Sequence, residues 1–449
     1  MIADLKPYPE YKESGIPWIG NVPSDWRVER TKCIFRSRKE LNVGRQNTNV
    51  LSLTLRGVVN NDPESPEGMV PKDYATYQLF KKHDLVFKLI DLENIRTSRV
   101  GLVHEDGIMS SAYVRLAPTK SVIIRFFYLQ FFDLYTRAVF NALGAGVRST
   151  LGAADLGELR IVIPPPAEQA AIVRFLDHWN GRLEKAIRAK RRVIALLQEQ
   201  KQAIIHRAVT RGLDPNVKLK DSGIPWLGEI PEHWDVSRVK NEFECLNNRR
   251  IPLSSPERGR MTRRDYDYYG ASGVIDRVDD YIFDDDLLLI AEDGANLVLR
   301  NLPLAIIARG KFWVNNHAHI LKPKGSDLEY LQAVMEGINY RPWISGAAQP
   351  KLTKDRVLAI SIAVAPREEQ QAIMDFVHTE TAPITTAIAR YEREISLLRE
   401  YRTRLTADVV TGKLDVRAAA AQLPEEAEEE PLPDPEIPEE ETELGEVEA

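Results

Sequence analysis

The segment SGIPWIGNVPSDW at residues 14–26 returns almost unchanged as SGIPWLGEIPEHW at residues 222–234. Extended by four residues at the C-terminal end, the alignment of the two copies has ten identities in seventeen positions. Chance does not produce such agreement, so the chain contains an internal duplication. The copies hold four of the chain's seven tryptophans, which pair as Trp18 with Trp226 and Trp26 with Trp234.

Two further pairs of segments repeat downstream. PPPAEQAAIVRFL from Pro164 corresponds to VAPREEQQAIMDFV from Val364, and AVTRGLD from Ala208 corresponds to VVTGKLD from Val409. Each half is therefore a motif, a variable block and a helix. This order predicts a first domain at 1–165, a first spacer helix at 166–213, a second domain at 214–364, a second spacer helix at 365–417 and a tail at 418–449.

Each predicted spacer helix opens after prolines and near a glutamate and carries one apolar seam at heptad spacing. A helix with a single apolar seam needs a partner, and the nearest candidate is the other copy. About 40 residues would make a rod of roughly 60 Å. The alternative is that each helix packs only on its own domain. Pro383 is expected to kink or restart the second helix. The seams include Ile172, Leu176, Trp179, Leu183, Val193, Leu197 and Ala208, and Ile373, Val377, Ile384, Leu398, Leu405 and Val409.

The variable blocks share an order of elements without sharing sequence. The first has strand-like HDLVFKLI, RVGLVHE and SSAYVRLAP, followed by an amphipathic helix around IIRFFYLQFFDLYTRAVF. The second has DDDLLLIAED, LAIIARG and FWVNNHAHILKP, followed by DLEYLQAVMEGI. The alternation of apolar and polar residues predicts strands and then a helix in both. The fold class is therefore α+β, with two domains of one architecture in tandem.

Composition limits the class of protein. The chain of 449 residues is 43% hydrophobic and 28% charged, and its two cysteines, Cys33 and Cys245, lie outside any CxxC spacing. Neither a disulfide framework nor a zinc site is indicated. No apolar run is long enough for a membrane helix, and the N-terminus lacks a signal-peptide core, so we expect a cytoplasmic protein.

The net charge conceals an uneven distribution. The whole chain carries −6, while residues 424–449 contain thirteen Asp or Glu and no Lys or Arg, so the remainder carries +7. The Pro-rich acidic tail is predicted to be disordered. It is either a solubility tail or a segment that repels or mimics nucleic acid.

These repeats resemble the specificity subunit of type I restriction-modification systems. The resemblance covers residues 8 to about 417 and rests on G-I-P-W-x-G-x-[VI]-P-x-x-W, on the P-x-EQ type of helix start and on VTGKLD. It implies two target recognition domains that read a split, asymmetric DNA target, and helices that pair as an antiparallel coiled coil in a pseudo-twofold repeat. The implied partners are double-stranded DNA, two methyltransferase subunits and restriction subunits. S-adenosylmethionine, ATP and Mg would be held by partner subunits. The acidic tail departs from the family pattern.

Reading DNA needs paired donors and acceptors on loops that can enter the major groove. Polar loops in both halves qualify, and their chemistry differs between the halves, so they should read different bases. The opposing interpretation is that each residue is only a solvated or turn-forming loop residue. The candidates are Asp91, Asn94, Arg96, Thr97, Arg99, Gly144, Gly146, Arg148 and Ser149 in the first half, and Asp293, Asn296, Arg300, Asn315, His317, Gln349 and Lys351 in the second.

Catalytic motifs are weak in this sequence. FNALGAG is a faint match to a glycine-rich S-adenosylmethionine turn, but NPPY and DPPY are absent, as is a GxxxxGK[ST] phosphate loop. His317 and His319 would share one face of a strand, where packing or a DNA contact is favoured over a metal site. We therefore expect a non-catalytic DNA reader. The alternatives are a methyltransferase with diverged motifs and a coiled-coil assembly protein that does not touch DNA.

Overall fold

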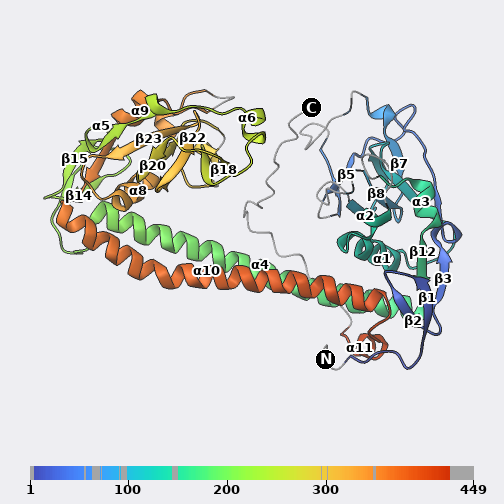
Figure 1. Cartoon of the computed structure of the whole chain (residues 1–449). Helices are drawn as coiled ribbons and strands as arrows, with labels where there is room; N and C mark the ends of the chain where they lie inside the picture. Colours follow the sequence, from blue (N-terminus) through green and yellow to red (C-terminus); the bar gives the residue numbers. More distant parts are fainter. Residues whose placement is uncertain are drawn as a thin grey trace. The chain divides into compact units, whose positions relative to one another are not determined.

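The structure, a computed structural model, places the two halves of the sequence in two compact units of mixed α and β structure (Figure 1). Unit 1 holds the described chain up to Ala189 and again from Arg393, and unit 2 holds Lys190–Glu392. Among the described helices, none is long and apolar enough to span a bilayer. The structure describes residues 5–54, 57–62, 71, 73–90, 92, 99–143, 150–294, 296–300, 302–346 and 350–424.

Unit 1 is built on a four-stranded antiparallel sheet in the order β4-β11-β8-β9. These strands are β4 (Phe35–Ser37), β8 (Leu85–Lys88), β9 (Arg99–Leu102) and β11 (Val114–Pro118). Helix α1 (Ile124–Thr136) packs on the sheet, where Phe127 meets Phe35 and Phe131 meets Phe87 edge to face. The remaining elements are β1 (Tyr11–Ile16), β2 (Gly20–Pro23), β3 (Arg27–Arg30), β5 (Leu51–Thr54), β6 (Gly57–Asn60), β7 (Gln78–Phe80), β10 (Gly107–Met109), β12 (Arg160–Ile163), α2 (Val139–Leu143) and α3 (Ala153–Glu158).

Unit 2 repeats this arrangement with a sheet in the order β16-β23-β20-β21, also antiparallel. These strands are β16 (Phe243–Cys245), β20 (Leu287–Ala291), β21 (Ala305–Ala308) and β23 (Ala318–Pro323), followed by helix α8 (Leu328–Gly337). A second sheet, β18-β17-β22-β19, comprises β17 (Tyr266–Gly270), β18 (Gly273–Val278), β19 (Phe283–Asp284) and β22 (Lys311–Val314). The remaining elements are β13 (Leu219–Asp221), β14 (Glu229–Pro231), β15 (Asp235–Arg238), β24 (Ser361–Val364), α5 (Val239–Glu242), α6 (Ser255–Gly259), α7 (Asn296–Leu299) and α9 (Lys354–Ala359).

The shared strand order confirms that the two variable blocks have one architecture. One predicted strand is corrected, because FWVNNHAHILKP forms two strands, β22 and β23, that belong to different sheets. The chain changes sheet at Asn315–His317, where buried Asn315 uses its side-chain oxygen to accept the backbone N–H of His317 at 2.8 Å. This local bond forms a turn and interrupts the strand.

The duplicated segment acts as an anchor for the start of each long helix. Trp26 is fully buried, and its Nε1 donates to Glu168 Oε1 at 2.9 Å. Equally buried Trp234 donates to Glu369 Oε2 at 2.9 Å. Each glutamate lies in the first turn of a long helix. The following glutamines, Gln169 and Gln370, bond back to the carbonyls of Pro164 and Ala365, both at 2.8 Å. The repeated tryptophan and the glutamate of the EQ pair are therefore the donor and the acceptor of one hydrogen bond, which occurs once in each half.

The long helices are α4 (Pro166–Arg211) and α10 (Arg367–Val410). In unit 1 Glu184 of α4 bonds Arg402 of α10 at 2.9 Å, and in unit 2 Lys201 bonds Thr385 at 3.0 Å. As the residue number rises along one helix it falls along the other, so the pairing is antiparallel. The predicted seam residues are buried or half-buried throughout. The expected restart at Pro383 is wrong: α10 continues through it, with Thr381 and Ile384 buried beside the exposed proline.

The end of each long helix enters the core of the other half's unit. Leu405 and Val409 of α10 are buried with Trp26 in unit 1, whereas Ala208 and Val209 of α4 are buried with Trp234 in unit 2. The alternative in which each helix packs only on its own domain is therefore wrong.

The predicted tail also begins too early at residue 418. Helix α11 (Arg417–Ala421) buries Ala419 and Ala420, and Leu423 just after it is also buried, so folded chain continues beyond residue 418.

Gly212 and Gly412 end the long helices with positive φ, +70° and +78°, beside the anchor tryptophans. We expect alanine to cost about 1 kcal/mol or more at both positions, because the left-handed conformation disfavours a Cβ. The cost should be larger at Gly412, about 2–4 kcal/mol, since its Cβ would overlap the ring of Pro23. At Gly212 the nearest atom, 2.9 Å away, is Oε1 at the end of the Glu369 side chain, which can shift more easily than a proline ring. Urea unfolding of both variants tests this order, and an equal cost would contradict it.

Candidate nucleic-acid interface

Three polar loops of unit 2 meet at the carboxyl end of β20. The backbone N–H of Glu292 donates to His317 O at 2.9 Å, and that of Leu352 donates to Glu292 O at 2.8 Å. Gly294 N–H also reaches Pro350 O at 3.2 Å. These bonds hold three loops side by side, and they are the loops that the sequence analysis predicted to contact DNA in the second half. The edge is continuous with the buried sheet, so its loops rest on a rigid support.

Glu292 lies at the centre of a charged group that we call the Glu292 cluster, comprising Arg250, Glu292, Asp293, His317, His319 and Lys351. Arg250 Nη1 donates to Glu292 Oε2 at 2.6 Å, and Lys351 Nζ lies 3.4 Å from Glu292 Oε1. Burial raises the pKa of Glu292, but the Arg250 bond and the neighbouring positive charges outweigh it, so the pKa lies below its ordinary value. Glu292 therefore stays ionised and orients the basic groups around it.

The outer members of the cluster present both a donor and an acceptor to solvent. His317 Nδ1 lies 2.9 Å from both carboxylate oxygens of Asp293, and its side chain is 48% exposed. Lys351 is 52% exposed. Within the described chain, no side chain is bonded to His317 Nε2. An exposed ammonium, an imidazole nitrogen and a carboxylate in one small area can bond phosphates and base edges.

His319, in contrast, is a structural residue. It lies in β23, is buried, and bonds the carbonyl of Leu352 through Nε2 at 2.7 Å and the amide of Asn247 through Nδ1 at 2.8 Å. The expectation that His317 and His319 share one strand face is wrong, because His317 lies in the turn before the strand. Among the residues that the structure describes, no His, Cys, Asp and Glu group is arranged to hold a metal ion.

Burial lowers the pKa of His319 below its ordinary value. The unfolded chain, with a histidine pKa of about 6.5, therefore gains this proton at a higher pH than the folded chain does. We expect the free energy of unfolding of unit 2 to fall as the pH drops below about 6.5, by up to roughly 1.4 kcal/mol per pH unit. His319→Gln should flatten this dependence in urea unfolding between pH 7.5 and 5. Parallel curves for the two proteins would contradict the assignment.

Three other nominated residues of unit 2 have structural partners. Asn296 closes its own loop through Leu302, with bonds of 2.9 and 3.0 Å. Arg300 bonds the carbonyl of Ile338 at 2.7 Å and that of Glu336, and so satisfies the carboxyl end of α8. Asn315 is buried in the turn already described. Of the nominated set in unit 2, the structure brings together Asp293, His317 and Lys351.

Most nominated residues of unit 1 lie outside the described chain. The chain that flanks them is informative, because Leu151 N–H donates to Leu89 O at 3.0 Å, as Leu352 does to Glu292 in unit 2. Leu89 and Leu151, which flank the two candidate loops of unit 1, therefore lie at the same edge of the equivalent sheet. Arg99 is the first residue of β9. Outside the described residues are Asp91, Asn94, Arg96, Thr97, Gly144, Gly146, Arg148 and Ser149, and Gln349 of the second half.

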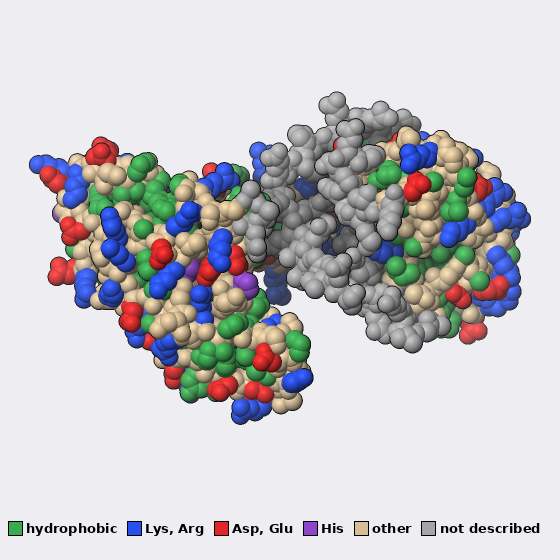
Figure 2. Space-filling view, turned by 90° about the horizontal axis from the view of Figure 1, so that it is seen from above, with side chains coloured by type: hydrophobic (Ala, Val, Ile, Leu, Met, Phe, Trp, Pro, Cys, Tyr) green, Lys and Arg blue, Asp and Glu red, His purple; other side chains and the backbone are tan. Residues whose placement is uncertain are grey.

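Sequence reasoning missed Asn247, Arg250 and Glu292. The run Asn247-Asn248-Arg249-Arg250, which comes shortly after β16, was a usable signal, because several polar side chains in a row after a strand indicate that the chain has left the sheet. Arg250 also bonds the carbonyls of Asn316 and Ala318, at 3.1 and 2.9 Å, and so fixes the turn that carries His317. Lys and Arg side chains are spread over one face of the molecule with Asp and Glu among them (Figure 2).

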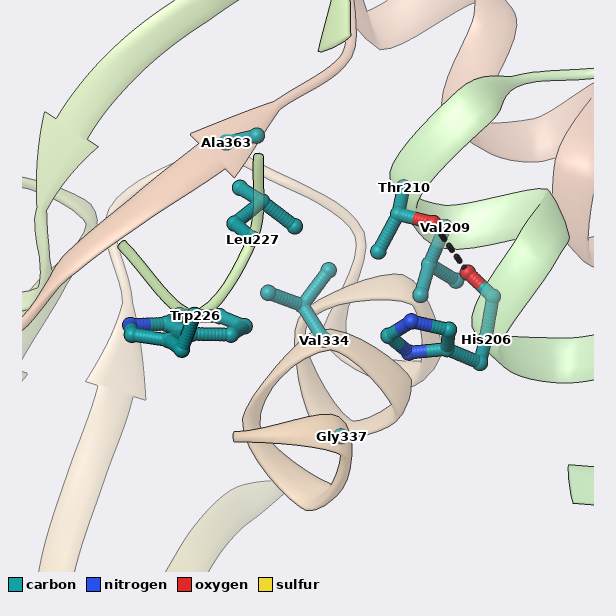
Figure 3. Close-up of a pocket in the computed structure, with 8 residues that line it drawn as sticks. All are labelled: His206, Val209, Thr210, Trp226, Leu227, Val334, Gly337 and Ala363. Carbon is teal, nitrogen blue, oxygen red and sulfur yellow. Dashed lines mark hydrogen bonds between the residues drawn. The ribbon is translucent and has the colours of Figure 1, made fainter. Parts of the chain in front are cut away.

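A separate pocket of unit 2 does not extend this site. It lies where the end of α4 meets α8 and is lined by His206, Val209, Thr210, Trp226, Leu227, Val334, Gly337 and Ala363 (Figure 3). Its lining is mainly apolar, and Thr210 Oγ1 bonds the backbone carbonyl of His206 at 2.6 Å within the helix. The space holds about one water molecule, so the pocket is a packing defect without room for a substrate.

Comparison with known proteins identifies relatives of both halves. A family model described as the type I restriction modification DNA specificity domain matches residues 58–190 and again residues 231–396. A putative type I restriction enzyme specificity subunit of Haemophilus influenzae is 33% identical over 139 residues, which are 30% of this chain and 34% of that protein. The chain thus spans about a third of the length of that relative. A putative type I restriction enzyme MjaX specificity subunit of Methanocaldococcus jannaschii is 21% identical over 89% of this chain and 96% of its own length.

The fold also has a counterpart among solved structures. A chain from a study described as the structural basis of complex assembly and conformational transition of the type I R-M system aligns with a TM-score of 0.57. The alignment covers 88% of this chain and 99% of that chain at 14% identity, which supports a common fold.

Proposed function

This chain belongs to the type I restriction-modification DNA specificity family, and we propose that it reads a bipartite, asymmetric DNA target and positions methyltransferase and restriction subunits on it. Unit 1 would read one part of the target and unit 2 the other. The chain would contribute sequence recognition and assembly, and the chemistry would be performed by its partners. The alternative of a methyltransferase with diverged motifs is not favoured.

The observation that carries the proposal is the pair of sheets with one strand order and different loops at the same edge. In unit 2 that edge carries the Glu292 cluster, and in unit 1 Leu89, just after β8, and Leu151 are bonded to each other at the corresponding edge. Two sheets with the same strand order orient their loops in the same way, whereas different side chains on those loops prefer different bases. This combination supports an asymmetric target.

The Glu292 cluster supports direct contact with DNA. Lys351 and His317 can donate to phosphate or to guanine acceptors, and Asp293 can accept from the amino group of cytosine. Glu292 and Arg250 would act as positioning residues, because their mutual bond holds the loops that carry the exposed groups. S-adenosylmethionine, ATP and Mg would be bound by the methyltransferase and restriction subunits.

A reconstitution experiment tests the proposal. The purified full chain is incubated with duplex DNA and labelled S-adenosylmethionine, first alone and then with methyltransferase subunits from the same host. We expect methyl transfer only in the second mixture, at sites defined by two separated sequence elements. Methyl transfer by the chain alone would establish the methyltransferase alternative. Assembly with the partners but random methylation would refute a role in reading sequence.

A further inference from the structure

A loop that follows β4 lies beside the candidate interface of unit 1. Strands β4 and β8 both run antiparallel to β11, so their carboxyl ends lie at the same edge of the sheet as the start of β11. Beyond β4, Leu41 pairs with Gln78 of β7. Buried Gln78 donates from Nε2 to the carbonyls of Ser110 and Tyr113, at 3.0 and 2.7 Å, just ahead of β11. The loop is therefore held close to the edge that corresponds to the Glu292 cluster of unit 2.

A tight turn at the tip of this loop is fixed from inside by fully buried Asn42. Its Oδ1 accepts the backbone N–H of Asn47 at 3.0 Å, and its Nδ2 donates to the carbonyl of the same residue at 2.9 Å. The Asn42 carbonyl accepts the N–H of Arg45 at 2.9 Å, and Gly44 and Arg45 have positive φ, +77° and +53°. A non-glycine residue keeps this conformation only where its surroundings fix it. Residues 42–46, which we call the Val43 turn, are therefore ordered before any ligand binds.

The Val43 turn exposes three side chains of different chemistry. Val43 is 66% exposed, the Arg45 side chain is 71% exposed, and Gln46 is also exposed. Arg45 Nη2 lies 3.4 Å from Asp73 Oδ1 in a solvated pair, which is weak and can exchange for another partner. A guanidinium suits guanine, a carboxamide suits adenine, and an aliphatic group suits the thymine methyl. The turn therefore presents the kinds of group by which proteins read base edges in the major groove.

Positive charge dominates the same loop. Residues 36–46 contain four Lys or Arg and one Glu, a net charge of +3. The one acid, Glu40, lies 3.6 Å from Nη1 of buried Arg115 and 4.0 Å from Nη1 of Arg38, so it offsets the charge of Arg38 only weakly. Lys39 is exposed, and among the residues that the structure describes no Asp or Glu is paired with it. Such cations beside a base-reading turn suit the phosphates that flank a groove.

We infer that the Val43 turn is a base-reading element of unit 1, in which Arg45 and Gln46 determine the bases recognised. Arg38 and Lys39 contact the phosphates on either side of those bases. The positive charge of the loop and its place beside the candidate interface favour DNA over a protein as its partner. The inference rests on the proposed function and adds to it, because it assigns recognition to a loop outside the candidates named from the sequence.

Sequencing of methylated sites tests base reading, with each full-length variant supplied with methyltransferase subunits from the same host. Arg45→Ala and Gln46→Ala should each relax discrimination at one or two base pairs, by roughly 5- to 150-fold, in the part of the target that His317→Ala leaves unchanged. Arg45→Lys keeps the charge but loses the planar fork of donors. It should lose discrimination as Arg45→Ala does, yet bind an unrelated duplex within about 2-fold of the unaltered chain.

The salt dependence of binding to an unrelated duplex tests the phosphate contacts. One double variant, Arg38→Gln with Lys39→Gln, removes two charges from the loop. The matched control, Lys81→Gln with Lys82→Gln, removes two charges from exposed sites just before β8, at the opposite edge of the sheet. Each lost phosphate contact reduces the slope of log affinity against log salt concentration by about 0.9. We expect the first variant to reduce the slope by about 2 and the control to leave it nearly unchanged.

Several outcomes would overturn the inference. Site-specific methylation that neither Arg45→Ala nor Gln46→Ala changes would show that the Val43 turn does not read bases. An Arg45→Lys variant that discriminates as well as the unaltered chain would reduce the role of Arg45 to a charge. Equal salt slopes for the two double variants would remove the phosphate contacts. If the unaltered chain and its partners methylate DNA at random, the proposed function itself fails, and the inference fails with it.

Discussion

Trp26→Ala is expected to lower the free energy of unfolding of unit 1 by about 3–5 kcal/mol. The indole is fully buried, packs edge to face against Tyr8 and Phe126, and donates to Glu168. Alanine would leave a cavity at the point where the anchor, the start of α4 and the end of α10 meet. Urea unfolding followed by near-ultraviolet circular dichroism measures the loss. A decrease below about 1 kcal/mol would contradict the anchor role.

Phenylalanine at the two equivalent tryptophans separates packing from hydrogen bonding. Trp26→Phe keeps most of the ring but removes a donor from Glu168, which is 5% exposed. Trp234→Phe does the same to Glu369, whose side chain is 27% exposed and can be hydrated. We expect the first variant to lose about 1–3 kcal/mol and the second clearly less. Equal losses would show that the burial of the Glu168 carboxylate does not add to the stability lost with its tryptophan donor.

The second large effect concerns the proposed reading of DNA by the two units. Arg148→Ala should relax discrimination in one part of the DNA target and His317→Ala in the other, each by about 1–3 kcal/mol, or roughly 5- to 150-fold. The reason is that His317 lies at the sheet edge of unit 2, whereas Arg148, which is outside the described residues, belongs by sequence to the corresponding loop of the first half. Sequencing of methylated sites, with each variant supplied with its partner subunits, measures both preferences at once. Relaxation of both parts by either variant would argue against separate readers.

Arg300→Ala is the matched control for this experiment. Arg300 was nominated from the same loop as Asp293, but its guanidinium bonds carbonyls at the end of α8. We expect this variant to destabilise unit 2 and to leave the preferred bases unchanged. A changed base preference at normal stability would show that Arg300 contacts DNA directly.

Much of the fold was predictable because its signals are local. The heptad seams of α4 and α10 predicted long paired helices, and the seam residues are buried or half-buried as expected. The alternation in HDLVFKLI and DDDLLLIAED predicted β8 and β20, and aromatic amphipathic stretches predicted α1 and α8. The turn at Asn315–His317 was missed because a single side-chain bond to the backbone overrides the strand pattern there.

The sequence by itself therefore determined the duplication, the α+β order of each half and two long helices with apolar seams, since repeats and periodicity are properties of neighbouring residues. Only the tertiary structure decided which distant groups meet. Trp26 reaches Glu168 across 142 positions, and each long helix ends in the core of the other half's unit. It also separated exposed His317 from buried His319 and placed Glu292 between Arg250 and Lys351. Such contacts depend on how sheets and helices pack, and packing brings together residues whose sequence separation carries no signal.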